Sequence, residues 1–367
     1  MYQTLPDQPA FDPAKPFNGL PPLPPGVPLE TPQVLKNVIK AREALAELKM
    51  ACRLIPNPLV LTNTIPLREA RASSEIENIV TTNDELFRAA WLVDQAPSPA
   101  TKEAIRYKNA LHEGIRALES RPLSIRTAEL VCKSLQGGPS PIRSTPGTYI
   151  GDSQASKRIY TPPEGRDVIL DHLALWERFI YSDHGLDPIV LMAVTHYQFE
   201  AIHPFHDGNG RTGRILNILL LMQEELLTAP VLYLSGFIVE NKSEYYRLLR
   251  EVTSEGNWEA WVLFMVRAVE SSARNALALI NDLRDAQDEV ADAIRGVGIG
   301  PAKDLAELLF INPYLRISNV VEAGLVKRQQ ATAWLNSLTE AGLLSDVKVG
   351  RERLFINDKA LSVLTRA

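Results

Sequence analysis

The chain has 367 residues, of which 45% are hydrophobic and 23% are charged, and its formal net charge is −5 at pH 7. This length fits two domains, or one large domain with an appendage. The acidic balance argues against a nucleic-acid surface along the whole chain, although one basic domain can lie within that average. The two cysteines, Cys52 and Cys132, lack metal-ligand or redox-pair spacing, and no apolar stretch is long enough to span a bilayer. Together these features predict a cytoplasmic protein with no membrane segment.

The first 32 residues are expected to form a proline-rich arm and not a domain. They contain ten prolines, which remove backbone donors and favour extended conformations. Two interpretations stay open: a disordered tail, or an arm that lies over the globule. In the second interpretation the apolar anchors are Phe11, Phe17, Leu20 and Leu23.

Residues 33–297 are predicted to be mainly α-helical, because apolar residues recur at spacings of three and four. After a first helix from residue 33, helical runs are expected at 83–93, 101–119, 125–135, 167–182, 187–200, 210–225, 243–250 and 257–295. The segment 147–165 interrupts this pattern with two strand-like triplets separated by Gly-Asp-Ser and closed by two prolines. It predicts a β-hairpin on a helical body.

Residues 298–367 are predicted to be a separate winged helix-turn-helix domain. Three short helices are expected at 304–310, 317–323 and 326–341, followed by a β-ribbon from 347 to 356. Nine Lys and Arg against seven Asp and Glu in residues 299–367 give this domain a weak basic bias.

The segment 203–214, His-Pro-Phe-His-Asp-Gly-Asn-Gly-Arg-Thr-Gly-Arg, is the most informative in the chain. Gly208, Asn209 and Gly210 allow a tight turn, so that backbone N–H groups of the loop and of the following helix converge. Helix N-termini attract anions through unpaired N–H groups and the positive end of the helix dipole. The turn is therefore predicted to bind phosphate.

The charged residues of this segment extend the prediction. Arg211 and Arg214 lie on one helix face and offer planar forks for phosphate oxygens. Asp207 is a single carboxylate beside the predicted phosphate, which is typical of shared Mg²⁺. His203 can exchange a proton near neutral pH. A polyphosphate site with a metal and a base indicates transfer of part of a nucleotide to a nucleophile.

Two other interpretations of the segment were weighed. His203 and His206 can form a metal pair, but no third ligand follows at short spacing. The glycine-rich stretch can also be an ordinary turn between helices with two solvated arginines.

The segment resembles the motif of the Fic family, HPF-x-D/E-GNGR-x-x-R, at every defined position. Residues 193–202, the stretch Tyr160–Pro163 and the segments after the motif are also similar to Fic proteins. The resemblance implies a Fic-fold helical bundle with a hairpin flap, and an enzyme that transfers AMP from ATP to Ser, Thr or Tyr hydroxyls of target proteins, or of itself, and releases pyrophosphate.

The resemblance also implies roles for individual residues. His203 would deprotonate the hydroxyl, Asp207 would hold Mg²⁺, and Asn209 with the N–H groups of the loop would stabilise the α-phosphate. Arg211 would hold the β-phosphate and Arg214 the γ-phosphate. Phe205 would anchor the loop in the core.

A second family signature implies autoinhibition. It lies at Ser73-Ser74-Glu75-Ile76-Glu77-Asn78, on an inhibitory helix expected at about 66–80. Glu77 would pair with Arg214 and block the γ-phosphate position, with Ser73 in support. Alternatively, Glu75 and Glu77 lie on a solvated helix start, and Ser73 caps that helix.

The remaining expectations concern ligands and partners. The hairpin would pair with an extended target strand, with Ile150 and Ile159 as candidate contacts. Aromatic and polar residues after the motif either wall the nucleoside or belong to the core: Tyr233, Asn241, Tyr245 and Tyr246. Two interpretations stay open for the winged helix: binding of proteins or of a second copy, or binding of DNA. In the second the contacts would come from Lys327, Arg328, Gln329, Gln330, Thr332, Lys348, Arg351 and Arg353.

Three functions were compared: AMP transfer to proteins, removal of AMP by the same site, and ATP-sensing transcriptional regulation. The complete motif favours the first. A homodimer is left open by the sequence.

Overall fold

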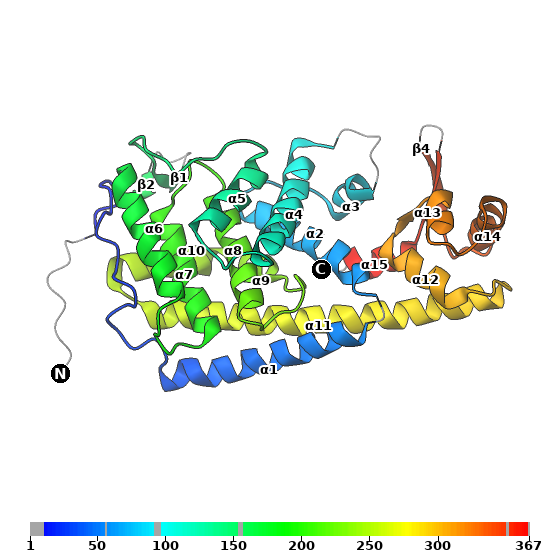
Figure 1. The fold of residues 1–367 in the computed structure, drawn as a ribbon, viewed down its shortest axis with the longest axis horizontal. Coiled ribbons are helices and arrows are strands. Elements are labelled where there is room, and N and C mark those ends of the chain that lie inside the picture. The colour runs from blue at the N-terminus through cyan, green and yellow to red at the C-terminus, as the bar shows by residue number, and fades with distance from the viewer. Residues whose placement is uncertain (1–10, 56, 92–96, 153–156, 350–351, 366–367) are drawn as a thin grey trace.

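The computed structural model describes residues 11–365 apart from residues 56, 92–96, 153–156 and 350–351. Its body is a bundle of helices, in which α1 (Pro32–Leu54) and α11 (Trp258–Gly296) lie side by side along one edge of the molecule (Figure 1). The other helices of the body stand on this layer: α2 (Leu59–Ile76), α3 (Asn83–Trp91), α4 (Pro99–Leu118), α5 (Ile125–Gln136), α6 (Arg166–Ile180), α7 (Pro188–Ile202), α8 (Asn209–Gln223), α9 (Leu234–Glu240) and α10 (Lys242–Glu255).

Helix α7 is the central helix of the body. Its side chains are buried along nearly its whole length, and Asp187 caps its start. Trp176 of α6 donates its indole N–H to the Thr195 carbonyl at 3.0 Å, and Trp261 of α11 donates to the Ala193 carbonyl at 2.7 Å. Because neighbours hold α7 from two sides, the turn that follows Ile202 starts from a fixed position.

The helical runs predicted for the body all coincide with helices of the structure, but two helices were missed from the apolar pattern. Helix α2 contains Pro66, which normally argues against a helix interior, and its start has no side-chain cap. The resemblance placed an inhibitory helix at about 66–80, whereas α2 runs from 59 to 76. Helix α9 has only seven residues, too few for periodicity to be recognised.

The proline-rich arm lies over the globule in its described part, residues 11–31; residues 1–10 lie outside the described residues. Phe17 is buried, and its N–H donates to the Thr161 carbonyl at 2.9 Å. The rings of Phe11 and Phe17 pack against Tyr160. The arm interpretation is therefore correct for this part of the chain.

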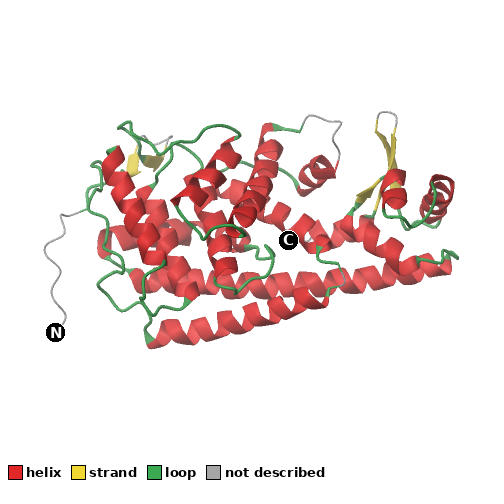
Figure 2. Cartoon of the chain, in the orientation of Figure 1, coloured by secondary structure: helices red, strands yellow, loops and turns green. Residues whose placement is uncertain are grey.

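Strands occur at two places in the described chain (Figure 2). The predicted hairpin consists of β1 (Ile150–Asp152) and β2 (Lys157–Tyr160), which are antiparallel with a register shift after Ile150. The second sheet belongs to the C-terminal unit and has the antiparallel order β3-β5-β4.

The C-terminal unit contains the three helices and the ribbon that the sequence predicts, plus a short strand and a last helix that it did not. The elements are α12 (Ala302–Ile311), β3 (Tyr314–Leu315), α13 (Ile317–Glu322), α14 (Arg328–Glu340), β4 (Ser345–Val349), β5 (Glu352–Ile356) and α15 (Asp358–Thr365). Helix α15 returns to α11, where Lys359 Nζ lies 2.6 Å from Glu289 Oε2. No helix in the described residues is long and apolar enough to cross a membrane.

A fully buried carboxylate attaches α2 to the bundle. Glu69 accepts hydrogen bonds from the Tyr107 hydroxyl of α4 at 3.1 Å, from the Ser235 N–H of α9 at 2.9 Å and from the Ser235 hydroxyl. Burial raises the pKa of Glu69, and the hydrogen bonds from Ser235 and Tyr107 oppose that rise. Three helices therefore meet at one polar group that has no access to water.

Replacement of Glu69 by alanine is expected to lower the free energy of unfolding by about 2–4 kcal/mol, because buried donors on Tyr107 and Ser235 lose their acceptor. Glu69→Gln keeps an acceptor and should cost less than half as much. Urea denaturation measures both. The control is Glu75→Ala on the same helix, whose carboxylate pairs loosely with Arg71 at 3.6 Å and should change stability by less than about 0.5 kcal/mol. A Glu69→Ala protein as stable as this control would contradict the assignment.

Candidate functional site

The turn between α7 and α8 brings the predicted motif together. Helix α7 ends at His203, which adopts a left-handed conformation with φ 49° and ψ 59°. This conformation costs a residue other than glycine roughly 1–2 kcal/mol. Gly208 precedes α8 with φ 80°, where the absence of a Cβ is required. The chain thus reverses within five residues and directs the start of α8 toward His203.

Asn209 and Phe205 close this loop. The Asn209 side chain accepts from the Phe205 N–H and donates to the Phe205 carbonyl, both at 2.8 Å, while the Phe205 ring is buried in the core as predicted. Both polar ends of Asn209 are therefore engaged with the loop itself. This arrangement gives Asn209 a role in holding the loop, and its contact with the α-phosphate stays a prediction.

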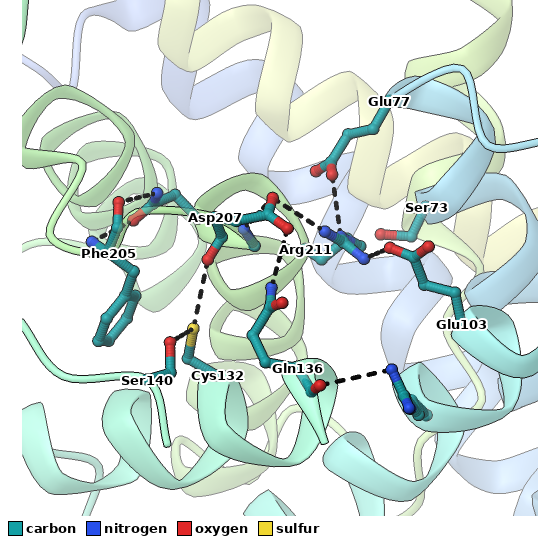
Figure 3. A network of polar contacts seen from close by, with 12 residues as sticks. Ser73, Glu77, Glu103, Cys132, Gln136, Ser140, Phe205, Asp207 and Arg211 are labelled. Carbon is teal, nitrogen blue, oxygen red and sulfur yellow. Dashed lines mark hydrogen bonds and ion pairs between the residues drawn. The ribbon is translucent and has the colours of Figure 1, made fainter. Parts of the chain in front are cut away.

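Arg211 is surrounded by three carboxylates (Figure 3). Its Nε lies 2.9 Å from Glu77 Oε2, its terminal nitrogens pair with Glu103 of α4 and with Asp207 at 3.2 Å, and its side chain is 2% exposed. The Nε contact with Glu77 lacks the alignment of a hydrogen bond, so this buried donor is poorly satisfied. Burial lowers the pKa of Arg211 and the Glu77 carboxylate raises it.

Arg214 lies one helical turn further along α8 and is equally buried. It donates to the Ser73 hydroxyl at 2.7 Å, to the Ser73 carbonyl at 2.9 Å and to Glu77 Oε1 at 2.9 Å. Burial lowers the pKa of Arg214, but Glu77 together with Tyr245, Glu200 and Tyr107 outweighs this effect, and the pKa is raised overall. Glu77 thus bridges both arginines, and Ser73 holds the second one.

The Glu77 carboxylate lies over the first turn of α8. A Cβ at Gly210 would come within 2.7 Å of Glu77 Oε1, so glycine is needed there for the close approach. The first N–H groups of a helix have no intrahelical partners and favour a negative charge at this position. An internal carboxylate therefore occupies the place predicted for an anion.

The structure corrects the alternative interpretation of this carboxylate. Helix α2 ends at Ile76, and Glu77 is its C-terminal flanking residue. Ser73 and Glu75 thus lie in the last turn and not at a solvated helix start. Ser73 is buried against Arg214 and does not cap the helix start, whereas Glu75 pairs with Arg71 beside the site.

The His203 imidazole is held in a buried position with its Nδ1 unpartnered among the described residues. Burial lowers the pKa of His203 to about 4, with a further lowering from the Arg143 guanidinium and an opposing effect of Glu200 and Glu77. The ring is therefore neutral, and able to accept a proton, throughout the neutral pH range.

Asp207 is the candidate Mg²⁺ ligand, and its side chain is 69% exposed. Oδ1 accepts from the Gly208 N–H at 2.6 Å, and Oδ2 accepts from Gln136 of α5 at 3.2 Å. In the described chain, no group of three or more acidic, His or Cys side chains is placed to hold a metal by itself. One open carboxylate beside an anion site fits Mg²⁺, which takes few protein ligands and completes its shell with phosphate and water.

The four residues predicted either to wall the nucleoside or to belong to the core differ in their burial and contacts. Tyr246 is 43% exposed, and its ring packs edge-on against Tyr245. Tyr245 is buried, with its hydroxyl 2.9 Å from His196 Nε2. The Tyr233 ring lies under Arg68, and Asn241 donates to its own helix at the Phe237 carbonyl. The structure therefore favours the core interpretation for Tyr245.

The flap candidates lie on opposite strands of the hairpin. Ile150 and Ile159 are both partly buried, and Ile150 packs against the core. Tyr160 follows Ile159, and its hydroxyl donates to the Ala201 carbonyl at 2.7 Å, two residues before the base candidate. The hairpin is thus attached directly to the end of α7.

Only some of the residues of the C-terminal unit that could contact DNA are exposed and without an internal partner that the structure shows. Lys327, Arg328, Gln329 and Gln330 are exposed at the start of α14, Thr332 is partly buried, Lys348 is exposed on β4, and Arg351 lies outside the described residues. Arg353, however, donates to Asp346 at 2.6 Å and to Asn336 at 2.7 Å. One of the predicted wing contacts is therefore neutralised within the unit itself.

Three family models match the chain. They are "Fic/DOC family N-terminal" over residues 35–116, "Fic/DOC family" over residues 130–221, and "Protein adenylyltransferase SoFic-like, C-terminal domain" over residues 302–360. The second range contains the whole turn from His203 to Arg214. This part of the chain is therefore similar to the Fic/DOC family.

Similar proteins agree with this assignment. Proteins named "Protein adenylyltransferase Fic" from Drosophila melanogaster and Drosophila sechellia are 33% identical over 126 residues, which is 34% of this chain and 24% of each relative. The chain thus matches about a quarter of their length.

Solved structures show the fold. A Fic family protein from Desulfovibrio desulfuricans G20 aligns over 92% of this chain and 98% of its own, with a TM-score of 0.57 and 23% identity. Fic-1 from C. elegans aligns over 68% of this chain and 74% of its own, with a TM-score of 0.52 and 20% identity. The mainly helical Fic fold is therefore confirmed.

Three residues that shape the site are not indicated by the sequence: Glu103, Gln136 and Arg143. Glu103 and Gln136 lie on helices α4 and α5. Charged and polar side chains are common on helix surfaces, so these two gave no signal in the sequence. Arg143 lies in a loop of irregular structure, where no periodic signal exists.

The His203 imidazole is expected to titrate with a pKa of about 4, well below the ordinary value of about 6.5. The neutral form then persists as the pH falls, until protonation near pH 4 removes the base. NMR of the protein labelled with ¹⁵N-histidine measures this pKa, and His203→Gln identifies the signal. Titration near 6.5 would contradict the buried environment described above.

Proposed function

We propose that this protein is a protein adenylyltransferase that moves AMP from ATP to hydroxyl groups of target proteins or of itself, with Glu77 as an internal inhibitor. One observation carries the proposal: Glu77 is held by Arg211 and Arg214 over the first turn of α8, where a phosphate would bind. The site therefore selects an anion, and the chain supplies one. The names of the Drosophila relatives and of the C-terminal family model support the AMP-transfer activity.

In the proposed reaction, His203 accepts the proton of a Ser, Thr or Tyr hydroxyl. The hydroxyl oxygen then forms a bond to the α-phosphorus of ATP, and the bond to the bridging oxygen of the β-phosphate breaks. Pyrophosphate leaves with that oxygen. Arg211 and Arg214 hold the β- and γ-phosphates, and N–H groups at the start of α8 face the attacked phosphate.

Asp207 would hold Mg²⁺ together with phosphate oxygens, and the ion would neutralise charge on the triphosphate. Its open carboxylate supports this assignment, because Gln136 and the Gly208 N–H leave part of it facing solvent. The same side chain pairs with Arg211, so the metal ligand and the phosphate ligand are fixed relative to each other.

The inhibitory role of Glu77 follows from charge and geometry. Its two carboxylate oxygens occupy one nitrogen of Arg211 and one of Arg214, so a triphosphate in the same place would meet like charge. When Glu77 is absent, Glu103 and Asp207 still hold the terminal nitrogens of Arg211, while its Nε becomes available. Removal of Glu77 alone therefore opens the phosphate position and leaves both arginines in place.

Glu77→Gly is expected to gain AMP when incubated with ATP and Mg²⁺, at least about tenfold faster than the unmodified chain, since a competing contact of about 1.4 kcal/mol changes affinity tenfold. Adding His203→Ala should lower that gain by about 10²–10⁴-fold, because the general base is lost. Intact mass spectrometry detects the AMP adduct.

The matched control is Glu75→Gly, which removes a carboxylate two residues away that contacts Arg71 and neither arginine of the motif. It should behave like the unmodified chain. An AMP gain that survives His203→Ala would contradict the role of the base.

The reverse reaction, removal of AMP, is tested by starting from AMP-modified protein. Removal of AMP should require Glu77, whereas addition should not.

A further inference from the structure

Arg143 connects the flap to the turn that carries the proposed base. Its side chain donates from Nε to the His203 carbonyl at 2.7 Å, and from a terminal nitrogen to the Ile202 carbonyl at 3.1 Å and the Pro163 carbonyl at 2.5 Å. Its own N–H donates to the Pro204 carbonyl at 2.9 Å. One residue thus holds three successive residues of the catalytic turn and the segment that leaves the flap.

The environment of Arg143 is unusual for a charged side chain. The residue is 1% exposed, and its hydrogen bonds within the described chain go to main-chain carbonyl oxygens. A buried charge is retained only where its donors are well satisfied. Here the acceptors include the last carbonyls of α7, which carry the negative end of the helix dipole. The guanidinium therefore replaces the solvent that would otherwise bind this helix end.

The contact with His203 is made where the backbone is under strain. His203 ends α7 in the left-handed conformation, which turns its carbonyl away from the helix axis. Glycine would adopt this conformation freely, but an imidazole is required at this position by the proposed function. The Arg143 Nε–H binds the displaced carbonyl and so favours the backbone conformation that presents the ring.

The contact with Pro163 reaches the flap. Pro163 follows β2 by three residues, and the arm residue Phe17 binds the intervening Thr161 from the other side. Tyr160 adds a second link, since its hydroxyl binds the Ala201 carbonyl. The Arg143 side chain touches both the flap exit and the main chain of His203.

We infer that Arg143 is a positioning residue, which fixes the proposed base relative to the flap so that a hydroxyl presented there meets the His203 imidazole. This inference rests on the function proposed above, because it assigns the hydroxyl to a substrate at the flap. The Arg143 charge also disfavours a second positive charge on the imidazole. The other charged group that influences this ring is Glu77 from the end of α2, which raises the pKa of the imidazole, and a hydrogen bond with the backbone of Glu200 in α7 acts in the same direction.

The test uses the full chain with Glu77→Gly as the parent and Arg143→Gln, Arg143→Lys and Arg106→Gln as variants. Arg106 also donates to a main-chain carbonyl, that of Gln136, but is exposed and touches neither the turn nor the flap. The rate constant for AMP gain is measured by intact mass at saturating ATP, and the Kd for ATP is measured separately. Thermal unfolding shows whether each variant is folded.

Arg143→Gln is expected to lower the rate constant by about 10²-fold, because misplacement of reacting groups by about 1 Å costs that much, while the Kd for ATP changes less than threefold. Arg143→Lys keeps the charge but loses the planar fork, so it should recover part of the rate. Arg106→Gln should match the parent within twofold. Equal losses in rate and in ATP affinity, or a rate within threefold of the parent, would overturn the inference.

A second measurement does not depend on the reaction. In Arg143→Gln the pKa of the His203 imidazole, followed by ¹⁵N-histidine NMR, should rise from about 4 toward its ordinary value. If Arg143→Gln does not fold, Arg143→Lys is used instead. In Arg143→Lys the pKa of the His203 imidazole should stay lowered, while the rate of AMP transfer should fall. An unchanged pKa in Arg143→Gln contradicts the proposed contact. If the Glu77→Gly parent gains no AMP, the proposed function fails, whereas this titration still tests the link between Arg143 and His203.

Discussion

The arrangement of the site depends on one carboxylate held by two buried guanidinium groups. Glu77 reaches from the end of α2 to Arg211 and Arg214 on α8, and both arginine side chains are 2% exposed. Two buried cations without an anion between them would be costly, because burial penalises charge and each repels the other. The Glu77 carboxylate removes that cost in this state. A site of this kind needs an anion, and under the proposed function Glu77 and a triphosphate would compete for that place.

The polar groups around this contact are fixed by helices from different parts of the chain. Glu103 of α4 holds Arg211 from the side opposite the loop, and Ser73 of α2 holds Arg214. Glu69, one turn before Ser73, attaches α2 to α4 and α9 without contact with water. Arg143 attaches the turn at His203 to the segment that leaves the hairpin at Pro163. Buried polar groups therefore set the positions of the ligands, while the apolar core sets the positions of the helices.

The sequence predicted the helices with clear apolar periodicity and the residues that belong to a contiguous motif. Helix α2 was missed by the periodicity because of Pro66, and the resemblance placed it correctly only near its C-terminal end. The contacts of Glu103 and Arg143 depend on helices and loops that meet only in the folded chain, so no local pattern contains them. For Asn209 the motif predicts a place in the site but not the two hydrogen bonds with Phe205, which depend on the folded turn.

Two of the three carboxylates that contact Arg211, Glu77 and Glu103, lie at different places in their helices. Glu103 lies within α4, whose start is capped by Ser98, so its backbone is held in a packed helix. Glu77 lies beyond the last residue of α2, and the next residue, Asn78, has φ 64° and binds Lys242 at the start of α10. Rotation of the chain at this helix end can withdraw Glu77 while Glu69 and Ser73 keep α2 attached. A triphosphate would then exchange with one terminal carboxylate and find both arginines already in position.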